Sequence, residues 1–224
     1  MSSICKELKI FFKGKPNEKA LLDLFNKSYK KEKNFSDATR SLVYELFKDY
    51  NILVLDPDDH RLKLSFKEIA LDELKNFSSH KIVNNTIKKI KNSYNKKIKI
   101  QVNPRILNLF YLSKSKRYRI EFKEGEYVLT EKNITFKKDE FINHIESNPN
   151  CISPNVILRP LYQESILPNL AYVGGGSEIS YWLELNDLFK FYSLPFPILV
   201  VRKSLLLINK RDFEKIDNLN LKIQ

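Results

Sequence analysis

The chain has 224 residues, the length of one large domain or two small ones, and 42% of them are hydrophobic. That share supports a buried core and excludes global disorder. The formal net charge of +12 suggests nucleic-acid binding, but lysine supplies 31 of the 39 basic residues. Lysine shares A/T-rich codons with the abundant Asn and Ile, so we expect solvated lysine faces and no nucleic-acid partner.

Cysteine usage and the apolar runs indicate the compartment. The chain has two cysteines, Cys5 and Cys151, and no CxxC motif, which fits a reducing environment. The first residues lack the apolar region of a signal peptide, and no apolar run approaches the roughly 20 residues of a membrane span. We expect a cytoplasmic protein without a membrane partner. The three histidines are isolated, so no metal site is expected.

The N-terminal half begins with helical patterns over residues 4–50, where Ser36 is a candidate N-cap for a helix reaching Tyr50. The apolar run 52–56 then predicts a strand buried on both faces of a parallel sheet. Asp56 falls at its carboxyl end, where open α/β sheets bind ligands, so it is a candidate substrate-binding residue. Residues 64–94 predict further helix with a weak point at Ser78-Ser79.

The following segments change character. Residues 99–136 hold short β-rich segments and predict a small antiparallel insert. A helix is expected over residues 137–147. Two strands, near residues 170–173 and 197–201, then flank a helix over 178–192, which favours a parallel α/β arrangement. We expect a helical region with the first core strand (1–98), the insert (99–136) and the second part of the core (137–224).

Three of the five glycines in the chain are adjacent, Gly174, Gly175 and Gly176. A strand–glycine–helix order permits positive φ, close approach of the backbone and anion binding at the helix N-terminus. The run is either a tight turn or a ligand-facing loop. Glu178, which follows it, is either a helix cap or a ligand-binding acid. Trp182 is either a core residue or a stacking platform.

Arg159 is one of two basic residues between Cys151 and Val201, a stretch that contains four acidic residues. It forms either a salt bridge with Glu164 or Glu178, or a clamp for a carboxylate or phosphate. We favour the clamp.

The longest distinctive stretches of the sequence resemble those of a known family. Residues 153–164 and 166–176, continued by residues 178–183, closely resemble the cysteine-adding enzyme family of bacillithiol biosynthesis (BshC). Pieces at residues 38–47, 53–59 and 103–112 resemble the same family in the same order. The resemblance covers about residue 36 to residue 204.

The resemblance implies a Rossmann-like core related to class I aminoacyl-tRNA synthetases. It also implies an ATP-dependent cysteine ligase that adds cysteine to glucosamine-malate. Residue chemistry, rather than the family, supplies our site assignments. We predict as catalytic Arg159, Gln163 and Glu178; as cofactor-binding Gly174, Gly175 and Gly176; and as substrate-binding Asp56, Asn155, Tyr162, Tyr181 and Trp182.

The family's chain is longer than this one. Its segment with a Gly-Gln-Gln motif and its C-terminal coiled coil have no counterpart here. We therefore expect a central portion of the enzyme: an incomplete Rossmann-like parallel sheet with helices and a small antiparallel insert. The partners would be the missing segments or a second copy of the chain. A catalytically inactive truncated remnant, or a partner-binding α/β fragment, is the alternative.

Overall fold

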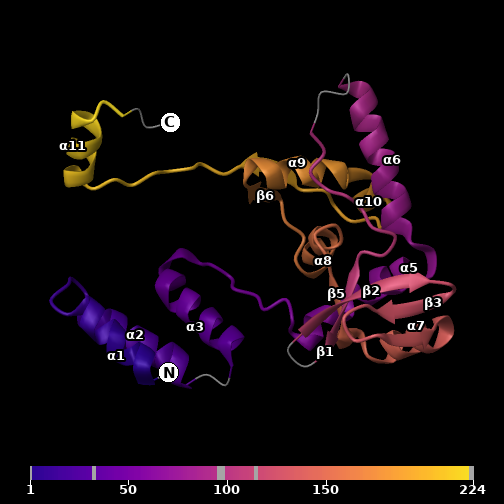
Figure 1. Ribbon diagram of the computed structural model, residues 1–224, viewed down its shortest axis with the longest axis horizontal. Helices are drawn as coiled ribbons and strands as arrows, with labels where there is room; N and C mark the ends of the chain where they lie inside the picture. The colour runs from indigo at the N-terminus through magenta and orange to yellow at the C-terminus, as the bar shows by residue number, and fades with distance from the viewer. Residues whose placement is uncertain (1, 32–33, 95–98, 114–115, 222–224) are drawn as a thin grey trace. The chain divides into compact units, whose positions relative to one another are not determined.

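A computed structural model of the protein describes residues 2–31, 34–94, 99–113 and 116–221. The described residues form two compact units that meet in sequence between Leu64 and Ser65. Figure 1 shows the helices and strands of both units, coloured along the chain. The fold is mixed α/β, and the domain boundaries expected at residues 98 and 136 stay predictions.

Helices are the only regular elements among the described residues of the first unit. Lys27 in one helix forms an ion pair of 2.6 Å with Glu45 in another. Asn34, and not Ser36, caps the third helix, because its side chain accepts a hydrogen bond from the Asp37 backbone N–H. The helices are α1 (Ser2–Phe12), α2 (Glu18–Lys31), α3 (Phe35–Phe47), the 3₁₀ helix η1 (Lys48–Tyr50) and α4 (His60–Lys63).

The strand predicted over residues 52–56 is wrong for this structure. The segment is irregular, and Ile52, Leu53 and Leu55 are 44%, 66% and 42% exposed. A strand needs a neighbour for its backbone N–H and C=O groups, and the described part of this unit holds only helices. The burial expected for this apolar run is also absent, because the described residues of the unit form no sheet in which it could pair.

The second unit begins within η2 (Leu64–Phe66) and continues with α5 (Lys67–Asn76) and α6 (Ser78–Ser93). The two longer helices are separated at Phe77, whose φ of 54° lies in the left-handed region. The Phe77 ring lies 5.1 Å from that of Phe122 in the sheet, and this packing offsets the backbone strain. The helix is thus interrupted one residue before the weak point predicted at Ser78-Ser79, and both serines belong to the first turn of α6.

The main sheet has five antiparallel strands in the order β4-β3-β2-β1-β5. The helix α7 (Lys138–Ser147) packs beside it (Figure 1), and Phe141 contacts Tyr127 with ring centroids 4.8 Å apart. The antiparallel prediction is confirmed, but the sheet extends beyond the expected insert. The strands are β1 (Leu109–Ser113), β2 (Lys116–Lys123), β3 (Glu126–Leu129), β4 (Ile134–Lys137) and β5 (Ile152–Pro154).

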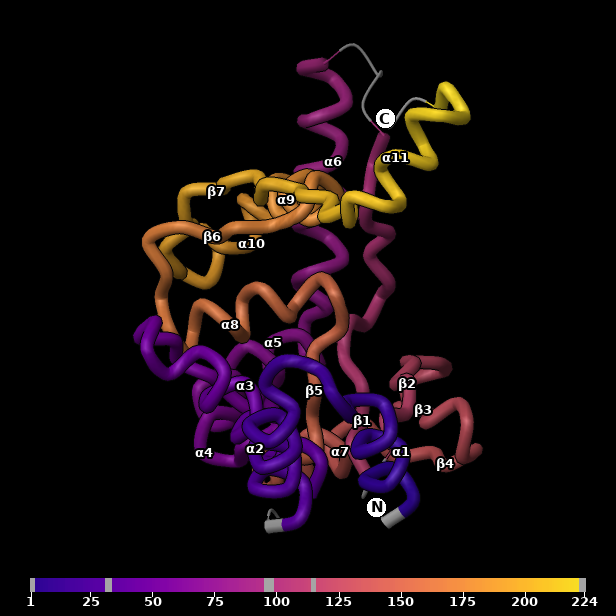
Figure 2. Tube along the Cα trace, turned by 90° about the vertical axis from the view of Figure 1, so that its left-hand side faces the viewer, coloured from indigo at the N-terminus to yellow at the C-terminus, as the bar shows by residue number. Residues whose placement is uncertain are grey.

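A separate two-stranded sheet flanks the glycine run. β6 (Ala171–Gly174) and β7 (Ile198–Val201) pair in parallel, as their sequences indicated. Figure 2 shows them beside α9 and α10. The larger parallel sheet that we expected is not formed by the described residues, and the main sheet is antiparallel. The remaining helices are η3 (Pro149–Cys151), α8 (Arg159–Ile166), α9 (Gly176–Glu184), α10 (Asn186–Phe191) and α11 (Lys210–Asn218).

A fully buried carboxylate, Glu73, joins three segments of the second unit. It accepts hydrogen bonds from the Ser79 backbone N–H and hydroxyl (3.0 and 2.6 Å) and from the Asn108 backbone N–H (3.0 Å). Asn108 Oδ1 accepts from Asn155 Nδ2 at 2.8 Å, and Asn155 Oδ1 accepts from the Ile157 N–H at 2.9 Å. Burial raises the pKa of Glu73 against the opposing effect of these bonds.

None of the helices in the described part of the chain is long and apolar enough to cross a membrane.

Glu73→Ala should lower the free energy of unfolding by about 3 kcal/mol, because the Ser79 and Asn108 N–H groups would stay buried without acceptors. Glu68→Ala is the matched control, since Glu68 is an exposed glutamate of the same helix, and should change it by less than about 0.5 kcal/mol. Urea denaturation measures both. Equal effects of the two substitutions would contradict the role given to Glu73.

Candidate functional site

Arg159 is the first residue of α8 and the charged centre of the candidate site. Its backbone N–H donates to the Asn155 carbonyl at 2.8 Å, which fixes where the helix begins. Its half-buried guanidinium donates to the Tyr181 hydroxyl (2.7 Å) and to Gln163 Oε1 (3.0 Å). Burial disfavours the charge, but hydrogen bonds with Tyr181 and Tyr172 hold the pKa of Arg159 above its usual value.

Arg159 has no ion-pair partner among the described residues. Glu164, one expected partner, is fully buried and accepts instead from the Asn169 backbone N–H and from Asn169 Nδ2, both at 2.8 Å. The salt-bridge interpretation with Glu164 is therefore wrong. A half-buried cation bonded to neutral groups can accept an anionic ligand.

Tyr172 on β6 connects the arginine to Glu178. Its hydroxyl donates to Glu178 Oε1 at 3.3 Å and also helps to raise the pKa of Arg159. Its ring stacks on Trp182 with centroids 4.0 Å apart. The sequence analysis missed Tyr172, although the alternation of strand residues places it on the same face as Gly174.

Glu178 lies in the first turn of α9, and its Oε2 accepts a hydrogen bond from the Gly175 backbone N–H at 2.9 Å. That bond is the main reason that the pKa of Glu178 lies below its usual value. The capping interpretation is confirmed. The second oxygen of the same carboxylate faces Tyr172, so Glu178 caps the helix and borders the site at the same time.

In the glycine run, the missing side chains avoid close contacts at two positions, and no position needs a positive φ. None of the three glycines adopts a left-handed conformation, which corrects the conformational reason we gave for them. A Cβ on Gly174 would lie 2.7 Å from Tyr172 Cε1, and one on Gly175 would lie 3.4 Å from Arg202 Nη2. Gly176 has open space around it. Arg202, a second cation at this loop, was also missed by the sequence analysis.

The structure gives the other predicted residues different positions. Tyr162 and Trp182 are buried, which favours the core interpretation of Trp182 over a stacking platform. Asn155 uses its side chain to hold Asn108 and the start of α8. Arg159, Gln163, Tyr181, Glu178 and the glycine run thus lie in one connected cluster, and the roles assigned to them stay predictions.

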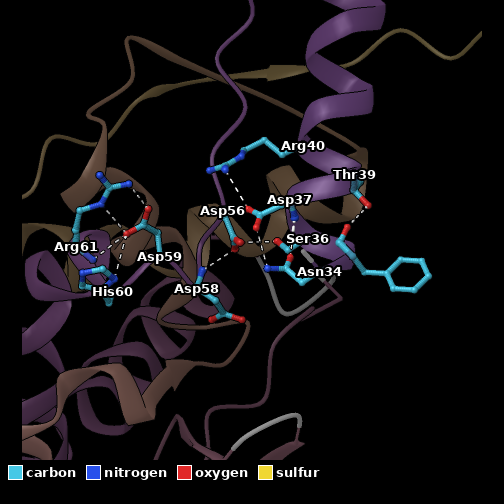
Figure 3. A network of polar contacts seen from close by, with 11 residues as sticks. Asn34, Ser36, Asp37, Thr39, Arg40, Asp56, Asp58, Asp59, His60 and Arg61 are labelled. Carbon is cyan, nitrogen blue, oxygen red and sulfur yellow. Dashed lines mark hydrogen bonds and ion pairs between the residues drawn. The ribbon is translucent and has the colours of Figure 1, made fainter. Parts of the chain in front are cut away.

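Asp56 belongs to the first unit, where Figure 3 shows it turned toward Ser36 and Asp58. It accepts hydrogen bonds from the Ser36 hydroxyl and from the Asp58 backbone N–H. Asp59 caps α4 by accepting from the Arg61 N–H at 2.9 Å. Asp56 thus stabilises its own turn, and a substrate contact stays a prediction.

Within the described ranges, no group of three or more His, Cys, Asp or Glu side chains could hold a metal ion.

Gly174→Ala should lower the free energy of unfolding by about 2 kcal/mol, because its Cβ would meet the Tyr172 ring, which Trp182 holds in place. Gly176→Ala is the matched control and should leave stability unchanged or raise it by up to about 1 kcal/mol. Chemical denaturation distinguishes the two. Destabilisation by Gly176→Ala alone would refute this account of the loop.

Comparison with known proteins identifies the family. The profile described as "Bacillithiol biosynthesis BshC, N-terminal Rossmann-like domain" matches residues 1–203. The match extends the resemblance toward the N-terminus, beyond residue 36. The profile describes the family's N-terminal domain, so it does not support our expectation that the chain corresponds to a central portion.

Several curated relatives carry the name "Putative cysteine ligase BshC". The relative from Flavobacterium johnsoniae is 44% identical over 205 residues, 92% of this chain and 38% of its own. The relative from Flavobacterium psychrophilum has the same identity and the same coverage. The relative from Christiangramia forsetii is 41% identical over 211 residues, 94% of this chain and 39% of its own. This chain thus spans less than half the length of these relatives, and it belongs to the BshC family of bacillithiol biosynthesis through its Rossmann-like domain.

Proposed function

We propose that this chain supplies the anion-binding part of a cysteine ligase site that joins cysteine to glucosamine-malate. The observation that carries the proposal is Arg159, a half-buried guanidinium bonded to Tyr181 and Gln163 and to no carboxylate among the described residues. An arginine held in this way presents a planar fork of donors to a carboxylate or phosphate. The cysteine carboxylate is the group that such a ligase must bind and activate.

Each side chain of the cluster has a role that follows from its chemistry. Tyr181 and Gln163 orient the Arg159 guanidinium, so that little conformational entropy is lost when a carboxylate binds. Glu178 has a lowered pKa, so it stays ionised and suits binding an ammonium group better than taking its proton. We assign Glu178 to the amino group of a substrate.

ATP would supply the activation of the carboxylate. Two features of the loop suit a phosphate group. The glycines leave room where Tyr172 and Arg202 approach the backbone. The run also begins an α-helix, whose N-terminal N–H groups favour an anion. Gly176 and Arg202 would hold the phosphates, since the Gly175 N–H already donates to Glu178. Arg202 is exposed, and its positive charge, like that of Arg159, helps to lower the pKa of Glu178.

We propose further that the active ligase includes segments beyond the ones present here. The relatives are longer than this chain, and the match to the Flavobacterium johnsoniae protein covers 38% of that protein. The β6–β7 sheet exposes Val173 (62%) and Ile198 (71%), although parallel strands are normally covered on both faces. The missing segments, or a second copy of the chain, would cover this face. A cytoplasmic location and the absence of a nucleic-acid partner stay predictions.

Incubation with cysteine, glucosamine-malate and ATP, followed by mass spectrometry of the thiol product, tests this function. We expect product when the chain is joined to the flanking segments of the Flavobacterium johnsoniae relative, because these complete the site. The chain without those segments is the control and should give little. No product from the joined protein, under conditions where the intact relative is active, would favour the inactive remnant.

In the joined protein, Arg159→Gln should lower kcat/KM for cysteine by roughly 100-fold, through loss of charge-assisted hydrogen bonds. Arg211→Gln changes an exposed arginine of α11 and should have no effect. Steady-state kinetics measure both variants, and thermal unfolding checks that each is folded. A folded Arg159→Gln variant with normal kcat/KM would refute the clamp.

A further inference from the structure

Glu164 is a fully buried carboxylate in the last turn of α8, directly after Gln163. The helix dipole disfavours a negative charge at that end, and burial adds the cost of removing a carboxylate from water. Two unfavourable local features at one residue are typical of a side chain that makes a specific functional contact. The partners of Glu164 show what that contact is.

The Glu164 carboxylate accepts hydrogen bonds from two residues. Its Oε1 accepts from Gln163 Nε2 at 3.1 Å and from Asn169 Nδ2 at 2.8 Å, and its Oε2 accepts from the Asn169 backbone N–H at 2.8 Å. Both partners border the candidate site. Gln163 accepts from Arg159, and Asn169 lies two residues before the start of β6.

The Gln163 amide has only one orientation that satisfies both of its neighbours. A guanidinium can only donate hydrogen bonds, and a carboxylate can only accept them. Gln163 must therefore turn Oε1 toward Arg159 Nη1 (3.0 Å) and Nε2 toward Glu164 Oε1 (3.1 Å). A reversed amide would place two donors together at Arg159 and two acceptors together at Glu164. The buried carboxylate thus decides which end of the amide faces the guanidinium.

The bonds to Asn169 restrain the other side of the site. Glu164 holds both the backbone N–H and the side-chain amide of Asn169. The pairing of β6 with β7 begins directly afterwards, where the Leu170 carbonyl accepts from the Ile198 N–H at 3.0 Å. Three residues after Asn169, Tyr172 donates to Glu178. One buried acid therefore connects the end of α8 with the start of the strand that carries Tyr172.

We propose that Glu164 is a positioning residue of the ligase site, which acts through Gln163 to hold the Arg159 guanidinium in the orientation that receives the cysteine carboxylate. The inference rests on the function proposed above for Arg159 and adds a residue that is too deeply buried to meet a substrate. A cation held in its binding orientation loses less freedom when the ligand arrives, so affinity for that ligand rises. Glu164 should therefore affect the use of cysteine and leave the use of ATP unchanged.

NMR of the arginine side chains in the full 224-residue chain tests the positioning without any ligase activity. Arg159→Gln identifies the Arg159 signal by its loss. In Glu164→Gln, rotation about the Arg159 Nε–Cζ bond should become roughly tenfold faster, because an amide at position 164 can pair with either end of the Gln163 amide. Glu164→Asp keeps the buried charge but is too short to reach Gln163 and Asn169 together, so it should have the same effect and serves if Glu164→Gln does not fold.

Glu184→Gln is the matched control. Glu184 is also a buried glutamate at the end of its helix, 2% exposed, and it accepts from the backbone N–H groups of Gln101 (2.8 Å) and Val102 (3.2 Å). Its substitution should lower the thermal stability of the chain and leave the Arg159 rotation rate unchanged. An unchanged rotation rate in the folded Glu164 variants, or an equal increase in Glu184→Gln, would overturn the proposal.

Kinetics of the joined protein test the consequence for the reaction. Glu164→Gln should raise KM for cysteine by roughly tenfold and change kcat and KM for ATP by less than about twofold. In the Arg159→Gln background it should have no further effect on KM for cysteine, because no guanidinium is left to orient. Equal changes of both KM values, or additive effects with Arg159→Gln, would show a purely structural role and refute the positioning. If the joined protein gives no product, the ligase function is contradicted, and the rotation rate of Arg159 alone decides whether Glu164 orients it.

Discussion

The buried carboxylate of Glu73 is the constraint on which the second unit depends. A carboxylate removed from water must be fully hydrogen-bonded, and the donors come from the start of α6 and from the residue before β1. Asn108 in turn accepts a hydrogen bond from Asn155, and the Asn155 side chain bonds to the backbone just before α8. The position of Arg159 therefore follows from a polar network that Arg159 joins through its backbone N–H and that contains no side chain of its cluster.

The same network also fixes the backbone of Arg105, through both hydrogen-bonding groups of the Asn108 side chain. Arg105 and Arg159 have no carboxylate partner among the described residues, and both depend on one asparagine, directly in one case and through Asn155 in the other. The unit's buried glutamates, Glu73, Glu164 and Glu184, accept hydrogen bonds from backbone N–H groups instead.

The sequence predicted those elements whose formation depends on residues close to them in the chain. The break between α5 and α6, the helix before Pro149 and the strands on either side of the glycine run all follow from periodicity and breakers within a few residues. The strand prediction for residues 52–56 was wrong because a strand forms only beside a partner strand, and the apolar pattern of one segment does not show whether such a partner exists. β5 was missed for the related reason that its three residues pair with a strand about 40 positions earlier.

The candidate site was predicted in part. Arg159, Gln163, Tyr181 and Glu178 come together, as the residue types suggested. Tyr172 and Arg202 were missed because their contribution depends on the parallel pairing of β6 with β7, which places both beside the loop. The stacking of Tyr172 on Trp182 has a practical consequence. The chain has one tryptophan, fully buried against the tyrosine that touches both Glu178 and Arg159. Its intrinsic fluorescence therefore reports on the packing of this site without any added label.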